Sequence, residues 1–152
     1  MKRFRFPLQP VAVLRAHHEV RAQEAFAAAV RAYLKTEEFL AATRARVAQF
    51  EATLTAGRQG RFSGADQGPA LSAYRQESAT EASSEQAMVA ARSTMQQRRA
   101  DYLAAHRKVE VIKRLEEKAR ATHRFECAAE EQRTFDEFAG RRSQVAKSLF
   151  SS

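Results

Sequence analysis

A chain of 152 residues that lacks tryptophan, has few glycines and prolines, and is rich in alanine, arginine and glutamate has the composition of long helices or coiled coils. Much of its 44% hydrophobic content is alanine, which buries little area, so the composition argues against a thick globular core. The formal charge of +8 permits an acidic partner, but acidic and basic residues are interspersed along the chain, as on solvated helix faces.

The sequence also argues against a secreted or membrane-spanning protein. Its single cysteine, Cys127, excludes an intrachain disulfide and a multi-cysteine zinc site. No run approaches the roughly 18 apolar residues that span a bilayer. The opening stretch MKRFRFPLQP is basic, but Pro7, Gln9 and Pro10 stand where a signal peptide has its apolar region. We therefore expect a protein that stays in the cytosol.

A first long helix is predicted over about residues 10–56. Pro10 suits the first turn of a helix, and neither glycine nor proline occurs again before Gly57. Apolar-leaning residues recur at alternating spacings of four and three, which is the heptad pattern of a coiled-coil seam. The seam consists of Ala22, Phe26, Ala29, Tyr33, Thr36, Leu40, Thr43, Val47, Phe50 and Leu54.

A glycine-rich loop is predicted over residues 57–69, where Gly57 would cap the first helix in the left-handed conformation. The loop lacks the Gly-Lys-Ser/Thr ending of a phosphate-binding loop, and no strand precedes it.

A second helix is predicted over about residues 70–140, ending at Gly140. We expect its polar segment SATEASSEQA, residues 78–87, to be its least stable part. Its predicted seam consists of Leu71, Tyr74, Ser78, Met88, Ala91, Met95, Tyr102, Val109, Ile112, Leu115, Ala119, Thr122, Phe125, Ala129, Phe135 and Phe138.

These elements predict an all-α fold, a single antiparallel coiled-coil hairpin over residues 1–152. With the turn near Phe62, a residue i faces about residue 126 − i, given the same 1.5 Å rise in both helices. This register places Phe26 beside Tyr102 and Leu54 beside Leu71. The second helix outruns the first beyond roughly residue 117, unless the N-terminal segment folds along it. Uncovered aromatic residues on such an overhang are typical of a protein contact.

The sequence offers little catalytic or metal chemistry. The register brings His18 near His106, but two histidines without a third ligand make a poor metal site. His123 and Cys127 are four residues apart and could form a thiolate–imidazolium pair, yet a slim rod has no pocket for a substrate. We therefore predict no enzyme, no cofactor and no metal.

Nucleic-acid binding is an alternative that the basic charge keeps open. Basic residues gather at the N-terminus and in the second helix, but acidic residues interrupt them and no recognised reading module is evident. The alternative is a basic coiled-coil nucleic-acid or ribosome-associated factor, and a homo-oligomeric structural coiled coil is a third possibility. The basic clusters are Lys2, Arg3 and Arg5; Arg98 and Arg99; and Arg107, Lys108, Lys113 and Arg114.

Motifs at the two ends of the chain resemble those of one protein family. The stretch FRFPLQPVAVLR, residues 4–15, is similar to the family's Phe-x-Phe-x-Leu opening followed by Val-x-x-Leu-Arg. The stretch EEQRTFDEFAGRR, residues 130–142, is similar to its Glu-Gln-Lys/Arg-x-x-Asp-Glu-x-Ala-x-x-Arg ending. These motifs resemble the FliJ family of flagellar type III export proteins. With the matching length and single glycine-rich interruption of the chain, the resemblance covers essentially its whole length.

The resemblance implies a two-helix coiled coil similar to the stalk subunit of rotary ATPases. Such a protein would be the central stalk of the ring of the export ATPase FliI, would promote ring assembly, would contact the export gate FlhA and would assist export chaperones. The ATPase regulator FliH is a further implied partner, and the free protein would be a monomer. It would work in the cytoplasm at the inner face of the plasma membrane, in flagellum biogenesis and hence motility and chemotaxis.

The resemblance also assigns residues to partners. The implied ATPase-facing end comprises Phe4, Phe6, Leu8, Leu14, Arg15, Phe135, Asp136, Glu137, Phe138 and Arg141. The nearest equivalents of the gate contact are Leu40, Phe50 and Tyr74, which fit equally well into the predicted seam.

Overall fold

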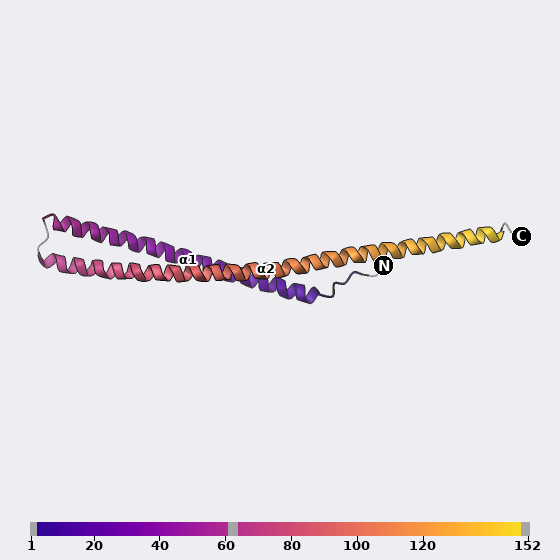
Figure 1. Cartoon of the computed structure of the whole chain (residues 1–152), viewed down its shortest axis with the longest axis horizontal. Helices are drawn as coiled ribbons and strands as arrows, with labels where there is room; N and C mark the ends of the chain where they lie inside the picture. Colours follow the sequence, from indigo (N-terminus) through magenta and orange to yellow (C-terminus); the bar gives the residue numbers. More distant parts are fainter. Residues whose placement is uncertain (1–2, 61–63, 150–152) are drawn as a thin grey trace. The chain divides into compact units, whose positions relative to one another are not determined.

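A computed structural model describes residues 3–60 and 64–149 of the chain, and these residues form two long helices (Figure 1). Helix α1 spans Gln9–Arg58 and helix α2 spans Gly64–Leu149. The described residues contain no strand. The predicted all-α class of two long packed helices is therefore confirmed.

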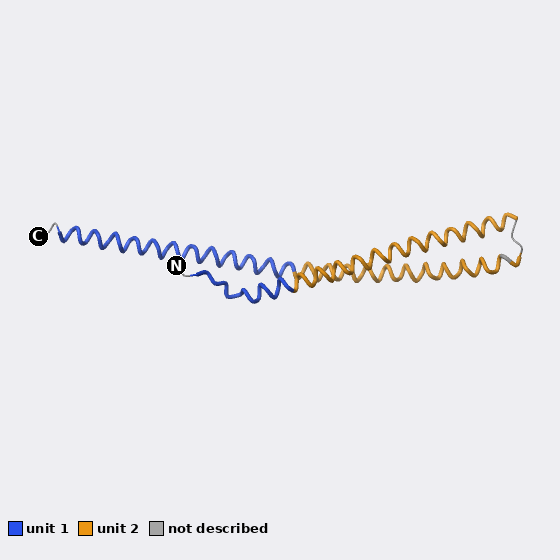
Figure 2. Tube along the Cα trace, turned by 180° about the vertical axis from the view of Figure 1, so that it is seen from behind, with its two compact units in different colours: residues 1–17, 106–152 blue, residues 18–105 orange. Residues whose placement is uncertain are grey.

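The chain divides into two compact units (Figure 2). The hairpin unit comprises residues 18–105, and the terminal unit comprises residues 1–17 and 106–152.

In the hairpin unit, α1 and α2 run antiparallel and pack along the predicted seam. Leu40 is 2% exposed and Thr43 is fully buried, with Ala29 and Val47 also buried. The ring of Phe26 stacks on that of Tyr102, with 6.3 Å between centroids and 7° between planes, as the register predicts. Alternating spacings of three and four keep these residues on one face, so each helix buries a stripe rather than a full circumference.

Small and polar residues fill the seam beside the predicted weak segment, residues 78–87. Thr43 donates its hydroxyl to the Phe39 carbonyl at 2.8 Å, and Ser84 donates to the Thr80 carbonyl at 2.6 Å. Both hydroxyls are buried, and these bonds within each helix satisfy them at little cost. The low stability expected of this segment stays a prediction.

Ion pairs bridge the two helices along the same segment. Arg44 lies 3.3 Å from Glu81 and 3.8 Å from Glu85, and Arg46 lies 3.3 Å from Glu77. All three pairs join residues within about one turn of the predicted register.

The helices are longer than predicted near the turn. Gly57 does not cap α1: it is buried within the helix, and Gly60 instead adopts a positive φ of 129°. Helix α2 begins at Gly64 rather than near residue 70 and continues through Pro69. A proline so close to the helix start removes only one intrahelical bond, that to the Ala65 carbonyl. The predicted turn centre, Phe62, lies outside the described residues.

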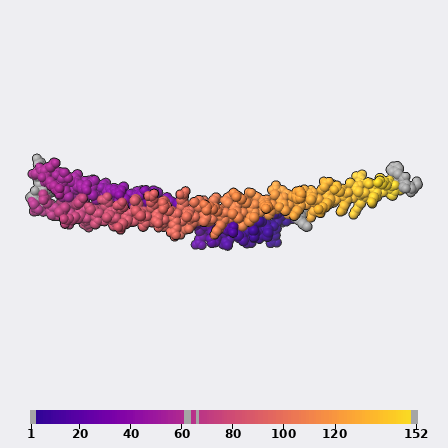
Figure 3. Space-filling view, in the orientation of Figure 1, coloured from indigo at the N-terminus to yellow at the C-terminus, as the bar shows by residue number. Residues whose placement is uncertain are grey.

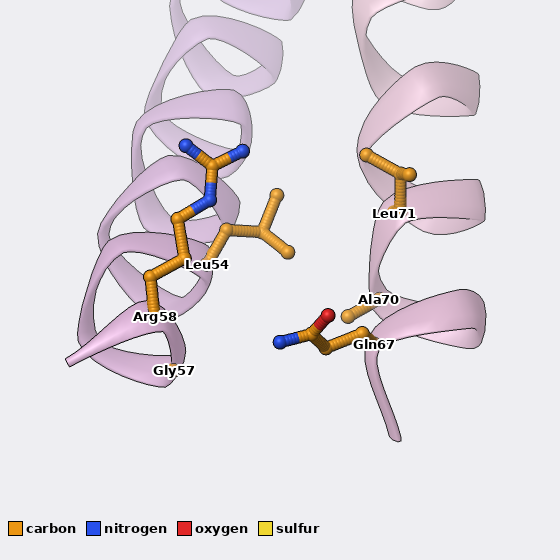
Figure 4. Close-up of a pocket in the computed structure, with 6 residues that line it drawn as sticks. All are labelled: Leu54, Gly57, Arg58, Gln67, Ala70 and Leu71. Atoms are coloured by element: carbon orange, nitrogen blue, oxygen red, sulfur yellow. The ribbon is translucent and has the colours of Figure 1, made fainter. Parts of the chain in front are cut away.

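A small cavity of about 70 Å³ lies between the helices at the turn end of the hairpin unit (Figure 4). Leu54 of α1 and Leu71 of α2 both line it, again as the register predicts. The cavity is well below the roughly 300 Å³ at which ligand pockets begin.

In the terminal unit, the start of α1 lies beside α2, and the N-terminal residues follow α2 further. Val109 and Ile112 are buried there, and Arg15 donates from Nη1 to the Lys108 carbonyl at 3.1 Å.

Beyond Ile112 the predicted seam of α2 marks the covered face only in part: its Ala119 and Ala129 are half-buried, whereas its Leu115 and Thr122 are exposed. Phe125, Phe135 and Phe138 are exposed, as expected for the part of α2 that outruns α1. The covered face runs through Glu116, Ala119 and His123, which are half-buried. These positions follow Ile112 at spacings of four, three and four residues. The covered face therefore continues the heptad repeat, even though the residues in it are not all apolar. Helix α2 also passes through Gly140 and ends at Leu149, beyond the predicted end at residue 140.

Candidate docking surface of the terminal unit

An N-terminal strap, residues 3–8, precedes α1 and packs on α2. The ring of Phe4 meets that of His123 edge-on, with 5.4 Å between centroids and an interplanar angle of 66°. Phe6 is 8% exposed and is the one buried aromatic residue of the described chain. Gln9 donates its backbone N–H to the Phe6 carbonyl at 3.2 Å and so joins the strap to the start of α1. The two phenylalanines anchor the strap.

Arg120 of α2 also contacts Phe4. Its guanidinium carbon lies 4.9 Å from the centroid of the Phe4 ring, in a cation–π contact. Glu116 accepts hydrogen bonds from Arg120 Nε and Nη2 at 3.1 and 2.7 Å, and so fixes the guanidinium. The contact is half-exposed, so its contribution to stability is about 0.5–1 kcal/mol.

An open groove runs between the strap, the start of α1 and α2. Its walls combine aromatic and proline side chains with a basic and an acidic residue. The groove is lined by Phe4, Arg5, Phe6, Pro7, Gln9, Pro10, Val13, Glu116 and Arg120.

Beyond the strap, α2 continues as a C-terminal extension, residues 131–149, in which every side chain is exposed. Phe135 is 69% exposed and Phe138 63%, and Val145 and Leu149 are exposed as well. Figures 2 and 3 show this end of α2 with no other described segment of the terminal unit beside it. Exposed aromatic and aliphatic residues this dense are typical of an interaction site.

The structure separates the opening and closing motifs that the sequence analysis assigned to one end. Phe4 and Phe6 are used within the chain, and Arg15 is half-buried against α2. Leu8 and Leu14 are exposed on the strap and on α1. The closing residues are all exposed on the extension, which begins about 12 Å beyond His123 at 1.5 Å per residue. These residues are Phe135, Asp136, Glu137, Phe138 and Arg141.

The residues assigned to the export gate lie in the hairpin unit. Leu40 is buried in the seam, and Phe50 and Tyr74 are half-buried. Tyr74 donates its hydroxyl to Glu51 at 3.1 Å.

Sequence reasoning missed Phe39, which is 53% exposed next to Leu40. It lies over a shallow groove lined also by Lys35, Thr36, Ser83, Ser84 and Ala87. The signal available in the sequence was a phenylalanine one position away from the heptad seam.

The remaining candidate groups form no larger site. His123 and Cys127 are in contact, with Sγ 3.7 Å from Nε2 and 3.8 Å from Nδ1. His18 and His106 belong to different units. Among the described residues, no group of three or more histidine, cysteine or acidic side chains could hold a metal ion. None of the helical segments described combines the length and apolar character needed to span a bilayer.

A comparison with protein families gives a match over nearly the whole chain. The family model described as "Flagellar FliJ protein" matches residues 4–148. This range contains the strap from Phe4, both helices and all but the last position of the extension. No curated protein and no solved structure matches the chain.

Proposed function

Because the chain belongs to the FliJ family of flagellar proteins, we propose that it is the central stalk of the ring of the export ATPase FliI. Membership of the family makes it a coiled-coil component of flagellar protein export. The proposal of a stalk is supported by the bare extension of α2, which is the part of the terminal unit that its own chain leaves uncovered.

An ATPase ring can hold such an extension through apolar contacts. Phe135 and Phe138 are three residues apart and so lie on one side of the helix. Burying each ring in a partner would contribute about 1.5–3 kcal/mol. Asp136, Glu137 and Arg141 lie close by and would set orientation, because exposed charges contribute more to specificity and association rate than to affinity. A stalk that binds in this way would promote ring assembly without catalysing a reaction itself.

We also propose that the hairpin unit contacts the export gate FlhA. Leu40 is buried, and Phe50 and Tyr74 are half-buried, so their contact with a gate would use the edges of the seam. Phe39 supplies an accessible ring at the same level. We propose that FliH and export chaperones are further partners, and that the protein acts in the cytoplasm at the inner face of the plasma membrane, in flagellum biogenesis, motility and chemotaxis.

A pull-down with the purified FliI hexamer of the same organism tests the stalk. The double variant F135A/F138A should weaken binding at least about tenfold, through the loss of two buried rings. The control is F39A/V89A, which removes two exposed apolar side chains of the hairpin unit. Equal binding by both variants would refute docking through the extension.

The salt dependence of binding separates this proposal from the nucleic-acid alternative. Docking through Phe135 and Phe138 should change only modestly with salt, whereas binding to duplex DNA or RNA should fall steeply, in proportion to the phosphates neutralised. Tight, steeply salt-dependent binding to nucleic acid, with no capture of the ATPase, would favour the alternative.

A further inference from the structure

The C-terminal part of α2 carries a heptad seam that no described segment covers. The seam residues are separated alternately by three and four positions, so they form one stripe along the helix. All of them are exposed. They are Ala128, Glu131, Phe135, Phe138, Arg142, Val145 and Leu149. We propose that a second copy of this chain covers this stripe, with the two α2 ends paired antiparallel.

The stripe is complementary to itself in one antiparallel register. When Phe135 of one copy lies opposite Phe138 of the other, the two-fold symmetry of a dimer repeats the contact in reverse. The same register sets Glu131 opposite Arg142, and Ala128 opposite Val145. In this single register an aromatic residue therefore faces an aromatic residue, an acidic residue faces a basic one, and a small residue faces a medium-sized one.

The charge along this end favours the antiparallel direction. Residues 126–137 contain five acidic residues and one basic residue, whereas residues 138–149 contain three basic residues and no acidic residue. An antiparallel pair lays the acidic half of each copy on the basic half of the other. A parallel pair would stack Glu131 on Glu131 and Arg142 on Arg142 within the seam. Charged residues at single seam positions commonly fix direction and register in coiled coils.

The dimer should be weak, which differs from the monomer that the sequence analysis expects but remains compatible with a stalk. The layers that pair, residues 128–145, span about 26 Å at 1.5 Å per residue, and Leu149 falls opposite Arg124 outside the stripe, so the interface is small. Ala139 and Ala146 flank the stripe and let the helices approach closely. The inference does not depend on the proposed function, but such a dimer would hide Phe135 and Phe138 from an ATPase.

Sedimentation velocity on the full chain, over about a hundredfold range of concentration, tests the dimer by mass action. Glu131→Arg and Arg142→Glu should each raise the dimer dissociation constant at least about tenfold, since each sets like charges opposite one another. The double variant E131R/R142E should restore dimerisation. Glu131 and Arg142 are about 16 Å apart along one helix, so rescue requires contact between copies.

The matched controls are Glu126→Arg and Arg133→Glu, which make the same charge changes at the outermost heptad position and should leave dimerisation unchanged. A chain that stays monomeric at every concentration would overturn the proposal, as would a double variant no better than the single ones. None of these measurements involves the ATPase, so loss of ATPase binding and loss of the dimer are read separately.

The single cysteine gives an independent test of direction. Cys127 of one copy would lie opposite Ala146 of the other, so spin labels on the two Cys127 residues should be roughly 30 Å apart, from 1.5 Å per residue. A parallel dimer in register would bring them to about 10 Å, the spacing of packed helices. The longer separation supports the proposal and the shorter one overturns it.

Discussion

Among single residues, Phe6 contributes most to holding the strap on α2. It is nearly fully buried, whereas Phe4 lies in a half-exposed contact between Arg120 and His123. Burial of a phenylalanine contributes about 1.5–3 kcal/mol, against about 0.5–1 kcal/mol for an exposed cation–π contact. The opening motif therefore has a structural role within the chain.

We expect Phe6→Ala to release the strap. Hydrogen exchange measured by mass spectrometry should then be faster in residues 113–123 of α2, by roughly tenfold or more, because every 1.4 kcal/mol lost makes the open state ten times more populated. Val20→Ala removes an exposed side chain of α1 that does not line the groove and serves as the control. Unchanged exchange in the Phe6 variant would show that the strap is held by other contacts.

A second prediction concerns Tyr33, whose hydroxyl donates to Glu37 at 2.6 Å. This hydrogen bond to a carboxylate raises the pKa of Tyr33 above its ordinary value of 10.0, with smaller contributions from desolvation and from the charge of Glu37. The bond therefore stabilises the fold below about pH 10 and is lost as the pH rises through the raised pKa.

Glu37→Gln should lower the pKa of Tyr33 toward its ordinary value. The measurement is the tyrosinate absorbance during an alkaline titration, with Tyr33→Phe used to assign the signal among the three tyrosines. A titration of Tyr33 that is the same in both proteins would contradict the assigned cause.

In the hairpin unit, α1 and α2 are joined by an apolar seam and by ion pairs, and these two differ in how much they stabilise the fold. Leu40 is 2% exposed, whereas Arg44 and Glu81 keep 52% and 30% of their side chains exposed. Solvent screens such a pair, so its contribution is about 0–1 kcal/mol. Burial in the seam is the larger stabilising effect.

Leu40→Ala should lower the free energy of unfolding by about 2–4 kcal/mol, through lost burial and the cavity left behind. Glu81→Gln should change it by less than about 1 kcal/mol, and by less still at high salt. Urea denaturation followed by circular dichroism compares the two. A larger loss for the Glu81 variant would mean that ion pairs rather than the seam hold the hairpin unit together.

The heptad pattern predicted the packed face of α1 and of α2 as far as Ile112. Beyond that point it was less accurate, because the apolar Leu115 was placed in the seam but is exposed. The strap, which carries no periodicity, instead lies on the face of Glu116 and His123. The ends of both helices were predicted too early, at Gly57 and Gly140. Glycine has a low helix propensity, but one glycine costs only about 1 kcal/mol and does not end a long helix.

Across the whole molecule, some of the predicted site residues are covered by the chain itself and others are exposed. The sequence was enough to recognise the opening and closing motifs, because each motif is a short continuous stretch. Whether Phe6 faces α2 or a partner was not readable, because it depends on the path of six residues without regular structure. The extension, and the exposure of its Phe135 and Phe138, could be anticipated from the difference in helix length.

The extension should be a marginal helix when the protein is alone. All of its side chains are exposed, so helix propensity and local pairs such as Gln132 with Asp136 are what hold it. Most helical stability in proteins comes from tertiary packing, which the extension lacks, and Gly140 in its middle lowers its stability by about 1 kcal/mol relative to alanine. A partner that binds the extension must therefore also order it, and that ordering reduces the affinity.

Gly140→Ala tests this directly. A methyl group at that position meets no atom within 4 Å, so the change should act through helix stability alone. Hydrogen exchange in residues 131–149 should slow by up to roughly fivefold, for a gain of about 1 kcal/mol. Exchange in the hairpin unit should not change. Any partner of the extension, whether the ATPase or a second copy, should bind the variant more tightly by a similar factor, because less order has to be gained on binding. If exchange slows without any gain in affinity, the extension docks in a form other than this helix.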